Sequence, residues 1–320
     1  YANLADIMPD SDLNSLKNDL MSNIESDKDS RGDWEKTYRE GLEYLGMKYE
    51  ERSQPFEGAS GVMHPLLSES VTQFQAQAYN ELLPSQGPVK TQVLGMTTPE
   101  TEQQAARVQE FMNYQLMQVM KEYDPETDQM LFYLPLSGSA FRKVYYDQNL
   151  GRAVSKFIPS EDLIVPYSAT DLHSATRITH VINMPMNDIR KLQQIGFYKD
   201  VDLDSGNMMA DETDDIQEGI DELQGVKPSY DDDDTCKVHE IHTELDIEGF
   251  EDMNAEGEDT GIKLPYIVTI GNNKVLSIRR NYKENDQLKQ RINYFVHYKF
   301  LPGLGFYGFG LTHMIGGLSK

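Results

Sequence analysis

Apolar residues recur three and four positions apart over the first third of the chain. Two stripes with this spacing run through Leu13, Leu16, Leu20 and Ile24, and through Trp34, Tyr38, Leu42 and Leu45. Residues at these spacings share one face of a helix, so each stripe predicts an amphipathic helix that buries that face. Gly46 follows the second stripe, where glycine commonly ends a helix.

Three more helices are expected before residue 140. Residues 51–64 are rich in Gly, Ser and Pro and predict a loop, after which Pro65 opens a helix. The apolar positions of that helix are Leu66, Val71, Phe74 and Leu82. Thr98 and Pro99 begin the next helix, because Thr98 can accept hydrogen bonds from free amides and proline fits the first helical position.

The helix that begins at Pro99 is expected to continue to about Tyr123. Its inward-facing side chains are expected to be Val108, Phe111, Met112 and Met120. A further helix is predicted from Pro125 to about Leu136, which completes a helical part of the chain.

The apolar spacing changes from helical to alternating after Ala140. Residues 141–146 and 152–158, joined by turn residues 147–151, predict a β-hairpin. A strand is expected next, over 176–183, and then a short helix over 187–194 that stops at Gly196. Later strands are expected over 237–246, 266–270, 274–278 and 294–300, with a turn at 271–273. Helices followed by antiparallel strands predict the α+β class.

Most of the negative charge lies in one segment. The chain has a formal net charge of -24, and residues 201–260 hold 22 Asp and Glu against Lys227 and Lys237, a net -20. The other 260 residues carry 31 acids against 27 bases, a net -4. Residues 202–234 contain few branched or aromatic side chains, so little packed structure and high mobility on a solvent-facing side are expected there.

The composition narrows the class of protein. A chain of 320 residues with 38% hydrophobic side chains can bury one large core or two smaller ones. No apolar stretch is long enough for a membrane span, and the N-terminus has no signal-like pattern. The single cysteine, Cys236, cannot form an internal disulfide, which suits assembly in a reducing cytoplasm.

Five segments are expected along the chain. They are a helical part over 1–139, a β-hairpin with a short helix over 140–200, the acidic segment over 201–235, an antiparallel β part over 236–300, and a glycine and aromatic stretch leading into a helix over 301–320. Residues 301–310 of this last segment are named the hinge below.

The hinge contains a glycine pattern known from dinucleotide sites. Gly303, Gly305 and Gly308 satisfy G-x-G-x-x-G after a predicted strand. A dinucleotide-binding unit also needs a second parallel strand and an acidic residue about 20 positions on, and twelve residues follow Gly308. We therefore favour a tight turn with packing by Phe306, Tyr307 and Phe309 over nucleotide binding.

A second candidate is a metal site around Cys236. The residues that could contribute ligands are Asp234, Cys236, His239, Glu240 and His242. In an extended strand His239 points to the opposite face from Cys236, Glu240 and His242, so the set does not converge on one ion without a bulge. The run Asp231–Asp234 lacks the glycine and terminal glutamate of a calcium-binding loop.

Other patterns give weak support for catalysis. Ser137-Gly-Ser139 resembles a nucleophile turn, but it lacks the G-x-S-x-G pattern and no histidine or acid can be assigned to it. The phosphate-binding G-x-x-x-x-G-K-[ST] pattern is missing from the sequence. We expect a protein that is not an enzyme, with no catalytic, cofactor-binding or metal-binding residue.

Aromatic and basic residues could contact nucleic acid. Tyr145, Tyr146 and the run Tyr294–Tyr298 could stack on bases, but half-buried strands look the same, and we favour packing in the core. The densest basic groups are small: Lys274 with Arg279 and Arg280, and Lys289 with Arg291. The basic surface of a sequence-reading DNA-binding protein is not indicated.

Four stretches of the chain resemble the portal proteins of tailed bacteriophages, especially the short-tailed and related types. They are Gly58-Ala-Ser-Gly-Val-Met-His-Pro-Leu-Leu, Gly138-Ser-Ala-Phe-Arg-Lys-Val-Tyr-Tyr-Asp147, Ile158-Pro-Ser-Glu-Asp-Leu-Ile-Val-Pro-Tyr167 and Leu301-Pro-Gly-Leu-Gly-Phe-Tyr-Gly-Phe-Gly-Leu-Thr-His-Met-Ile-Gly-Gly-Leu. The last is the most specific. None is catalytic, so the resemblance concerns architecture.

The resemblance implies a structural subunit of a ring, usually of twelve copies, at one vertex of the virion capsid. DNA passes through such rings during packaging and ejection, and a separate terminase hydrolyses ATP. The implied partners are further copies of the chain, the major capsid protein, head-to-tail adaptor proteins, the terminase large subunit and double-stranded DNA. Assembly is implied to occur in the host cytoplasm.

Within that family the chain resembles mainly the wing region, with the first stem helix starting near Leu311. The clip, second stem helix, tunnel-lining segment and crown would lie beyond Lys320. Two alternatives remain open: another head-to-tail connector protein of the virion, and a nucleotide-binding enzyme.

Overall fold

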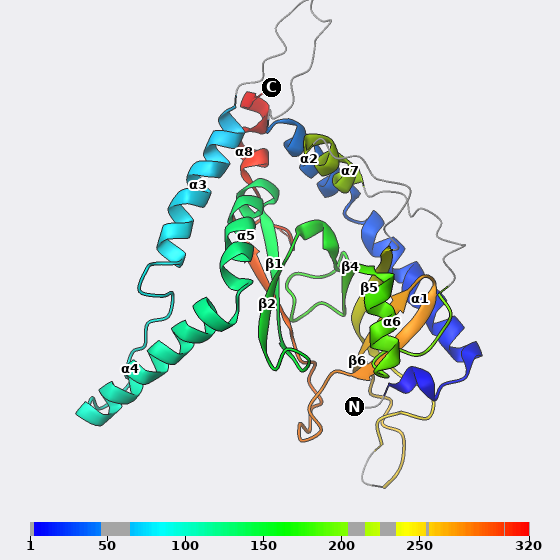
Figure 1. Ribbon diagram of the computed structural model, residues 1–320. Coiled ribbons are helices and arrows are strands. Elements are labelled where there is room, and N and C mark those ends of the chain that lie inside the picture. The colour runs from blue at the N-terminus through cyan, green and yellow to red at the C-terminus, as the bar shows by residue number, and fades with distance from the viewer. Residues whose placement is uncertain are drawn as a thin grey trace, which may run out of the picture. The chain divides into compact units, whose positions relative to one another are not determined.

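The computed structural model describes residues 3–45, 65–203, 215–224, 235–253, 256–303 and 305–319. In chain order its elements are η1 (Leu4–Asp6), α1 (Asp10–Asp29), α2 (Gly32–Glu43), α3 (Leu66–Leu82), α4 (Pro99–Tyr114), η2 (Gln115–Val119), α5 (Tyr123–Ser137), β1 (Ser139–Asp147), β2 (Arg152–Ile158), η3 (Ser160–Asp162), β3 (Leu163–Ile164), β4 (Arg177–Pro185), α6 (Met186–Gln194), α7 (Asp215–Gln224), β5 (Thr235–Leu245), β6 (Leu264–Gly271), β7 (Lys274–Arg280), β8 (Phe295–Lys299) and α8 (Leu311–Ser319) (Figure 1). The predicted α+β class is confirmed.

The chain forms two compact units, and each combines two separate stretches of sequence. Unit 1 comprises Tyr1–Arg39 and Glu161–Asn293, and unit 2 comprises Glu40–Ser160 and Tyr294–Lys320. These units cut across the five segments expected from the sequence.

Unit 1 is built around a five-stranded antiparallel sheet in the order β3-β4-β5-β6-β7. Neighbouring residues of a strand point to opposite faces, and both faces of this sheet are covered. Ile241 and Val268 pack with Leu20 and Ile24 of α1 on one face, whereas Val238 on the other face packs in a cluster with α6. Figure 1 shows α1 and α6 on different sides of these strands.

Polar contacts fix α1 and its surroundings to the sheet. The Asn3 side chain accepts a hydrogen bond from Ile278 N at 2.9 Å and donates one to Leu276 O at 3.1 Å. Arg177 of β4 contacts one carboxylate oxygen of Asp27 through Nη2 at 2.6 Å and Nε at 2.8 Å. This buried ion pair joins the end of α1 to the sheet.

The turn expected at residues 271–273 joins β6 and β7. Asn272 and Asn273 have positive φ values of 43° and 60°, which is the backbone of a tight two-residue hairpin turn. Asparagine tolerates this left-handed conformation better than most residues, so the local sequence explains the turn.

Unit 2 contains a three-stranded antiparallel sheet in the order β2-β1-β8. The predicted hairpin forms as β1 and β2, while the strand near the end of the chain pairs with β1 rather than with the strands that precede it in sequence. Helix α5 packs on this sheet through Met130, Leu131 and Leu134. α3 adjoins α5, where Tyr79 donates a hydrogen bond to Asp124 at 2.6 Å.

Helix α4 begins as expected but ends early and buries no residue. Thr98 accepts from Thr101 N, and the Thr101 hydroxyl accepts from Thr98 N, which forms a reciprocal cap. After Tyr114 the helix widens into one π turn, η2, and the helical run ends at Val119, four residues before the expected end near Tyr123. The inward orientation is also wrong for Val108, Phe111 and Met112, which are exposed, and correct for buried Met120.

The acidic segment contains a helix that the sequence analysis does not predict. Helix α7 carries Ile216, Ile220 and Leu223 at helical spacing, and Ile216 is fully buried. The spacing is a helical signal that the high acidic content obscured. Residues 204–214 and 225–234 of the expected mobile segment lie outside the described residues, as do Gly46 and residues 51–64. Among the described helices, none combines the length and apolar character required to cross a membrane.

Candidate functional site

The hinge turns the chain sharply between strand β8 and helix α8. Leu301 and Phe309 form an isolated antiparallel bridge, with their backbone N and O atoms 3.2 and 2.8 Å apart. Helix α8 begins two residues after Phe309. The hinge therefore fixes where α8 begins within unit 2.

Glycines allow the hinge to lie directly against the junction of α5 and β1. A Cβ atom added to Gly308 would overlap the carbonyl oxygen of Gly138, and one added to Gly138 would overlap the carbonyl of Gly308. Gly138 also ends α5 with φ of 83°, a conformation that favours glycine. Gly310 is packed equally tightly against the carbonyl of Leu136. Close backbone packing therefore explains these three glycines.

Aromatic rings hold the other side of the hinge. Phe306 is buried, and the centre of its ring lies 5.9 Å from the ring centre of Phe141 of β1, with the two rings stacked. The His297 ring of β8 lies 4.7 Å from Phe306 and 4.4 Å from Phe141. The hinge thus closes over β1 and β8 through three adjacent rings.

A buried hydrogen-bond network connects the same elements. The Ser139 hydroxyl accepts a hydrogen bond from Gly308 N at 2.8 Å and lies 3.1 Å from Nε2 of His297. The backbone carbonyl oxygen of Ser139 accepts hydrogen bonds from the hydroxyls of Ser137 and Ser160. Because Gly308 already donates to the Ser139 oxygen, the Ser139 proton can be donated to a neutral His297.

The Ser139 and His297 pair has the atoms of a nucleophile and a base but not their accessibility. Ser139 is fully buried, so its hydroxyl cannot meet a substrate in this conformation. Burial, and then the charge of Lys299, lower the pKa of His297 to about 3. Among the described residues no Asp or Glu hydrogen-bonds to His297. The contact fits a structural role at the base of the hinge.

We expect this half-buried histidine to make the protein less stable in mild acid. In the unfolded chain His297 binds a proton below pH about 6.5, whereas in the folded chain it does not until about pH 3. Stability from this residue is therefore complete above pH 6.5 and is lost as the pH falls, by about 2 kcal/mol between pH 7.5 and 5. Denaturant unfolding at both pH values should show a drop that is smaller by this amount in His297→Gln. Equal drops in the two proteins would contradict the assignment.

In the predicted G-x-G-x-x-G motif, Gly308 is engaged in these contacts within unit 2. Strand β8 is antiparallel to β1, so the strand, loop and helix do not form the parallel unit of a dinucleotide site. The Gly308 amide, which such a site would offer to phosphate, donates to Ser139 instead.

The possible metal ligands lie on both faces of strand β5. Cys236 is buried in the cluster beside α6, and Glu240 lies 2.7 Å from Nε2 of His242 on the same face. His239 points to the opposite face, as strand alternation predicts. Within the described residues no three of the His, Cys, Asp and Glu side chains come close enough to hold one ion. Asp231–Asp234 lies outside the described residues.

The basic groups are engaged within unit 1. Lys274 donates to the carbonyl of Asp202, and Arg279 stacks over Phe197 with its guanidinium carbon 4.1 Å from the ring centre. Lys289 pairs with Asp252. Arg291 donates to the carbonyls of Leu172 and Ala175, each at 2.8 Å.

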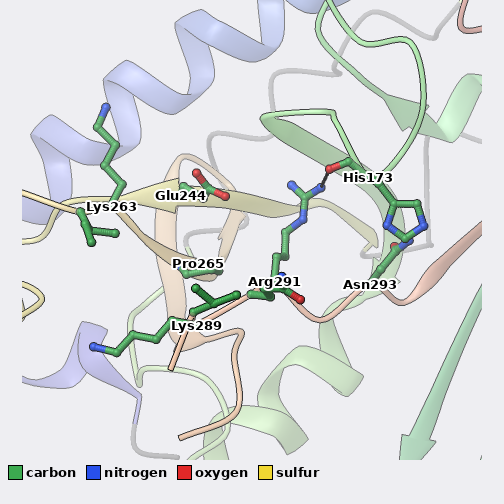
Figure 2. Close-up of a pocket in the computed structure, with 10 residues that line it drawn as sticks. His173, Glu244, Lys263, Pro265, Lys289, Arg291 and Asn293 are labelled. Atoms are coloured by element: carbon green, nitrogen blue, oxygen red, sulfur yellow. Dashed lines mark hydrogen bonds between the residues drawn. The ribbon is translucent and has the colours of Figure 1, made fainter. Parts of the chain in front are cut away.

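Arg291 also borders a hollow of about 460 Å³, which lies within unit 1 (Figure 2). The guanidinium of Arg291 points to the backbone at His173, while the ammonium groups of Lys263 and Lys289 point away from that guanidinium. Glu244, of opposite charge, lines the same hollow. Because these three cationic groups do not point to a common position, the hollow does not form an anion-binding site.

Exposure corrects the expectation for the aromatic strands. Tyr146 is 65% exposed and Tyr298 is 37% exposed, whereas Tyr145 and Tyr294 are half-buried. The core assignment is therefore wrong for Tyr146 and Tyr298. Sequence reasoning also missed the partners of Ser139. His297 joins it through the long-range pairing of β8 with β1, whereas Ser160 lies just beyond the end of the predicted β1–β2 hairpin, so the register of that hairpin could have indicated it.

The hinge and its buried network join β1, β8 and α5 within the described part of unit 2. The functional interpretation of the hinge depends on these contacts. A scan against models of known protein families and a search among curated proteins both give no match to the sequence.

Proposed function

We propose that this chain is a structural subunit of a bacteriophage portal ring. The observation that carries the proposal is the meeting of three of the portal-like stretches at one point. Gly138 and Ser139 come from the second stretch, Ser160 from the third and Gly308 from the fourth, and they share the buried network described above. Residues that are far apart in sequence thus act together to hold the hinge.

The network explains how a subunit of this kind could act without a chemical step. α8 begins directly after the hinge, and the Thr312 hydroxyl in its first turn donates to Leu136 O at 3.0 Å. The direction of α8 is therefore tied to α5 and β1. In a portal ring, a displacement of a stem helix held in this way would also displace the wing around the channel.

The charge distribution is compatible with a passage for DNA. Strong cationic contacts with many phosphates would raise affinity through counterion release and oppose sliding. Four of the basic residues in unit 1 instead contact carbonyl oxygens, an aromatic ring or a carboxylate of the same unit, as described above for Lys274, Arg279, Lys289 and Arg291. We propose that residues 1–300 lie on the outer flange, away from the narrowest part of the bore.

The proposed partners follow from a position at the capsid vertex. They are other copies of the chain in a ring of about twelve, the major capsid protein, head-to-tail adaptor proteins, the terminase large subunit during packaging, and double-stranded DNA in the channel. The terminase supplies the energy of ATP hydrolysis in this proposal.

Imaging of the purified full-length protein and of the assembled particle tests this function. We expect a closed ring with cyclic symmetry, with α8 along the channel wall and residues 1–300 outside it. A protein that stays monomeric at all concentrations, or a ring in which residues 1–300 form the narrowest part of the bore, would contradict the proposal.

The two alternatives predict different results. A head-to-tail connector would form a ring that binds an existing portal and is missing from particles before DNA is packaged. A nucleotide-binding enzyme would show a reproducible rise in its unfolding midpoint with NAD or ATP, because a ligand that binds the folded state stabilises it. We expect no shift with either nucleotide or with a metal chelator.

A further inference from the structure

Strand β2 forms one edge of the three-stranded sheet in unit 2. Backbone groups of the central strand β1 point alternately to its two neighbours, and the Val144 amide donates to Tyr294 O on the β8 side. The odd-numbered residues of β1 therefore bond to β2, and their partners in β2 have even numbers. The backbone N–H and C=O groups of Ala153, Ser155 and Phe157 consequently point away from the sheet. Outward groups of this kind are where a strand of another molecule can add.

Two of these outward amides meet carboxylates that come with helix α5. Phe157 N donates a hydrogen bond to Oε2 of Glu126, which lies in the first turn of α5. The Ser155 amide meets Glu122, the residue directly before α5. Burial raises the pKa of Glu122, but hydrogen bonds that include those from Arg152 and from the Ser155 amide lower it below its usual value.

A third outward group is engaged by the cation of the same cluster. Nη1 of Arg152 lies 2.7 Å from Oε1 of Glu122 and donates to Ala153 O at 3.2 Å. Each of the three outward-facing residues of β2 thus has one backbone group in contact with a charged side chain of unit 2.

The spacing of the two carboxylates matches the spacing of the two amides. Glu122 and Glu126 are four positions apart, so they lie about 6 Å apart along a helix axis. Ser155 and Phe157 are two positions apart, which is about 7 Å along an extended strand. Because these repeats are nearly equal, two side chains of one helix can meet alternate amides of the strand beside it, as the carbonyl oxygens of an added strand would.

Glu126 is charged at a position that opposes its charge. Burial raises the pKa of Glu126 above its usual value, although the Phe157 amide and the charges of Lys156 and Arg142 lower it. A carboxyl group whose pKa is higher in the folded chain than in the unfolded chain makes the folded state less stable when it is ionised. Stability alone therefore does not explain a carboxylate at this position.

We propose that Glu122 and Glu126 close the β2 edge to strand addition. Their oxygens take the places that the carbonyl oxygens of an added strand would need, so neither another copy of the chain nor an extended peptide pairs with β2. The contacts lie within unit 2, and the inference does not depend on the proposed ring.

Hydrogen exchange of single amides in the full chain tests this assignment. Glu126→Ala removes the acceptor of Phe157 N, so this amide should exchange faster by about tenfold or more. Glu126→Gln is the matched control, because it keeps a side-chain oxygen at the same place, and it should change the rate by less than about threefold. The amide of Val154 faces β1 within the sheet, so it reports on opening of the whole sheet and should exchange at an unchanged rate.

Self-association supplies a second measurement. An amide left without an acceptor regains one when a strand adds, so Glu126→Ala should lower the concentration at which aggregates with intermolecular β-structure form, on the order of tenfold. Infrared spectroscopy identifies such aggregates, and the Phe157 amide should regain protection within them. Glu110→Ala removes an exposed carboxylate from α4 and should change that concentration by less than about twofold.

Several results would overturn the proposal. Unchanged exchange of Phe157 in Glu126→Ala, or equal exchange in the alanine and glutamine variants, would show that the carboxylate does not hold this amide. Faster exchange of Val154 together with Phe157 would indicate loss of the sheet rather than an opened edge. Faster exchange of Phe157 without easier aggregation would show that the contact does not guard the edge. Ring formation is measured separately by imaging, so each of these results leaves the portal proposal in place.

Discussion

Replacing Gly308 by alanine is expected to destabilise unit 2 by about 3 kcal/mol or more. The new Cβ atom would overlap the carbonyl oxygen of Gly138, and it would lie 3.0 Å from the carbonyl of Leu301. Both neighbours are backbone atoms and cannot move aside as a flexible side chain would. Overpacking of this kind costs about 1–3 kcal/mol, and displacement of Gly308 would also remove its hydrogen bond to buried Ser139.

Gly305→Ala is the matched control in the same hinge. An added Cβ atom at Gly305 meets no heavy atom within 4 Å, so we expect a change in the free energy of unfolding below about 0.5 kcal/mol. Denaturant unfolding of both variants compares the two positions. Similar stability losses, or none in Gly308→Ala, would show that the close contact does not hold the hinge.

The second large effect is expected from Arg177→Met in unit 1. Asp27 is only 6% exposed, and burial raises its pKa although the Arg177 guanidinium, by hydrogen bond and charge, lowers it. Without Arg177 a buried carboxylate loses its partner, which typically costs about 3–5 kcal/mol. Chemical denaturation at pH 7.5 should show this loss. The loss should be smaller at pH 5, because protonation then removes the unpaired charge.

The double variant Asp27→Asn/Arg177→Met distinguishes the ion pair from lost packing. It removes the carboxylate charge together with the guanidinium, so it should be more stable than Arg177→Met alone. If the double variant were less stable than the single one, the unpaired charge would not be the cause of the loss.

Elements with local signals were predictable from the sequence. The reciprocal cap at Thr98 and the asparagine turn at Asn272 and Asn273 depend on neighbouring residues, and the structure shows both. Helix α7 also has a local signal in Ile216, Ile220 and Leu223, but the acidic composition around it favours an unpacked segment. Local propensity therefore defined element type better than composition did.

The surroundings of each element were less predictable. The stripe of Val108, Phe111 and Met112 correctly indicates an amphipathic helix, but periodicity does not say whether its partner belongs to the same chain. The same holds for Tyr146, which alternates with the half-buried residues Tyr145 and Asp147, because such alternation says only that one face of the strand is more covered than the other.

Contacts between distant residues were the least accessible part of the site. Ser139 meets His297 because β8 pairs with β1, and no local pattern encodes that pairing. The glycines of the hinge predict a tight turn, whereas their fit against Gly138 and Leu136 depends on the positions of α5 and β1, which the local sequence does not give.

The interleaving of the two units constrains how the chain can form during synthesis. Strands β1 and β2 are synthesised first, but the third strand of their sheet, β8, which pairs with β1, begins at Phe295, about 150 residues after β1. At translation rates of about 5–20 residues per second, the edge of β1 that β8 covers would wait roughly 8–30 s for its partner. An uncovered strand edge is a site for wrong pairing. The β1 edge of unit 2 is thus expected to need protection by chaperones until β8 has been made.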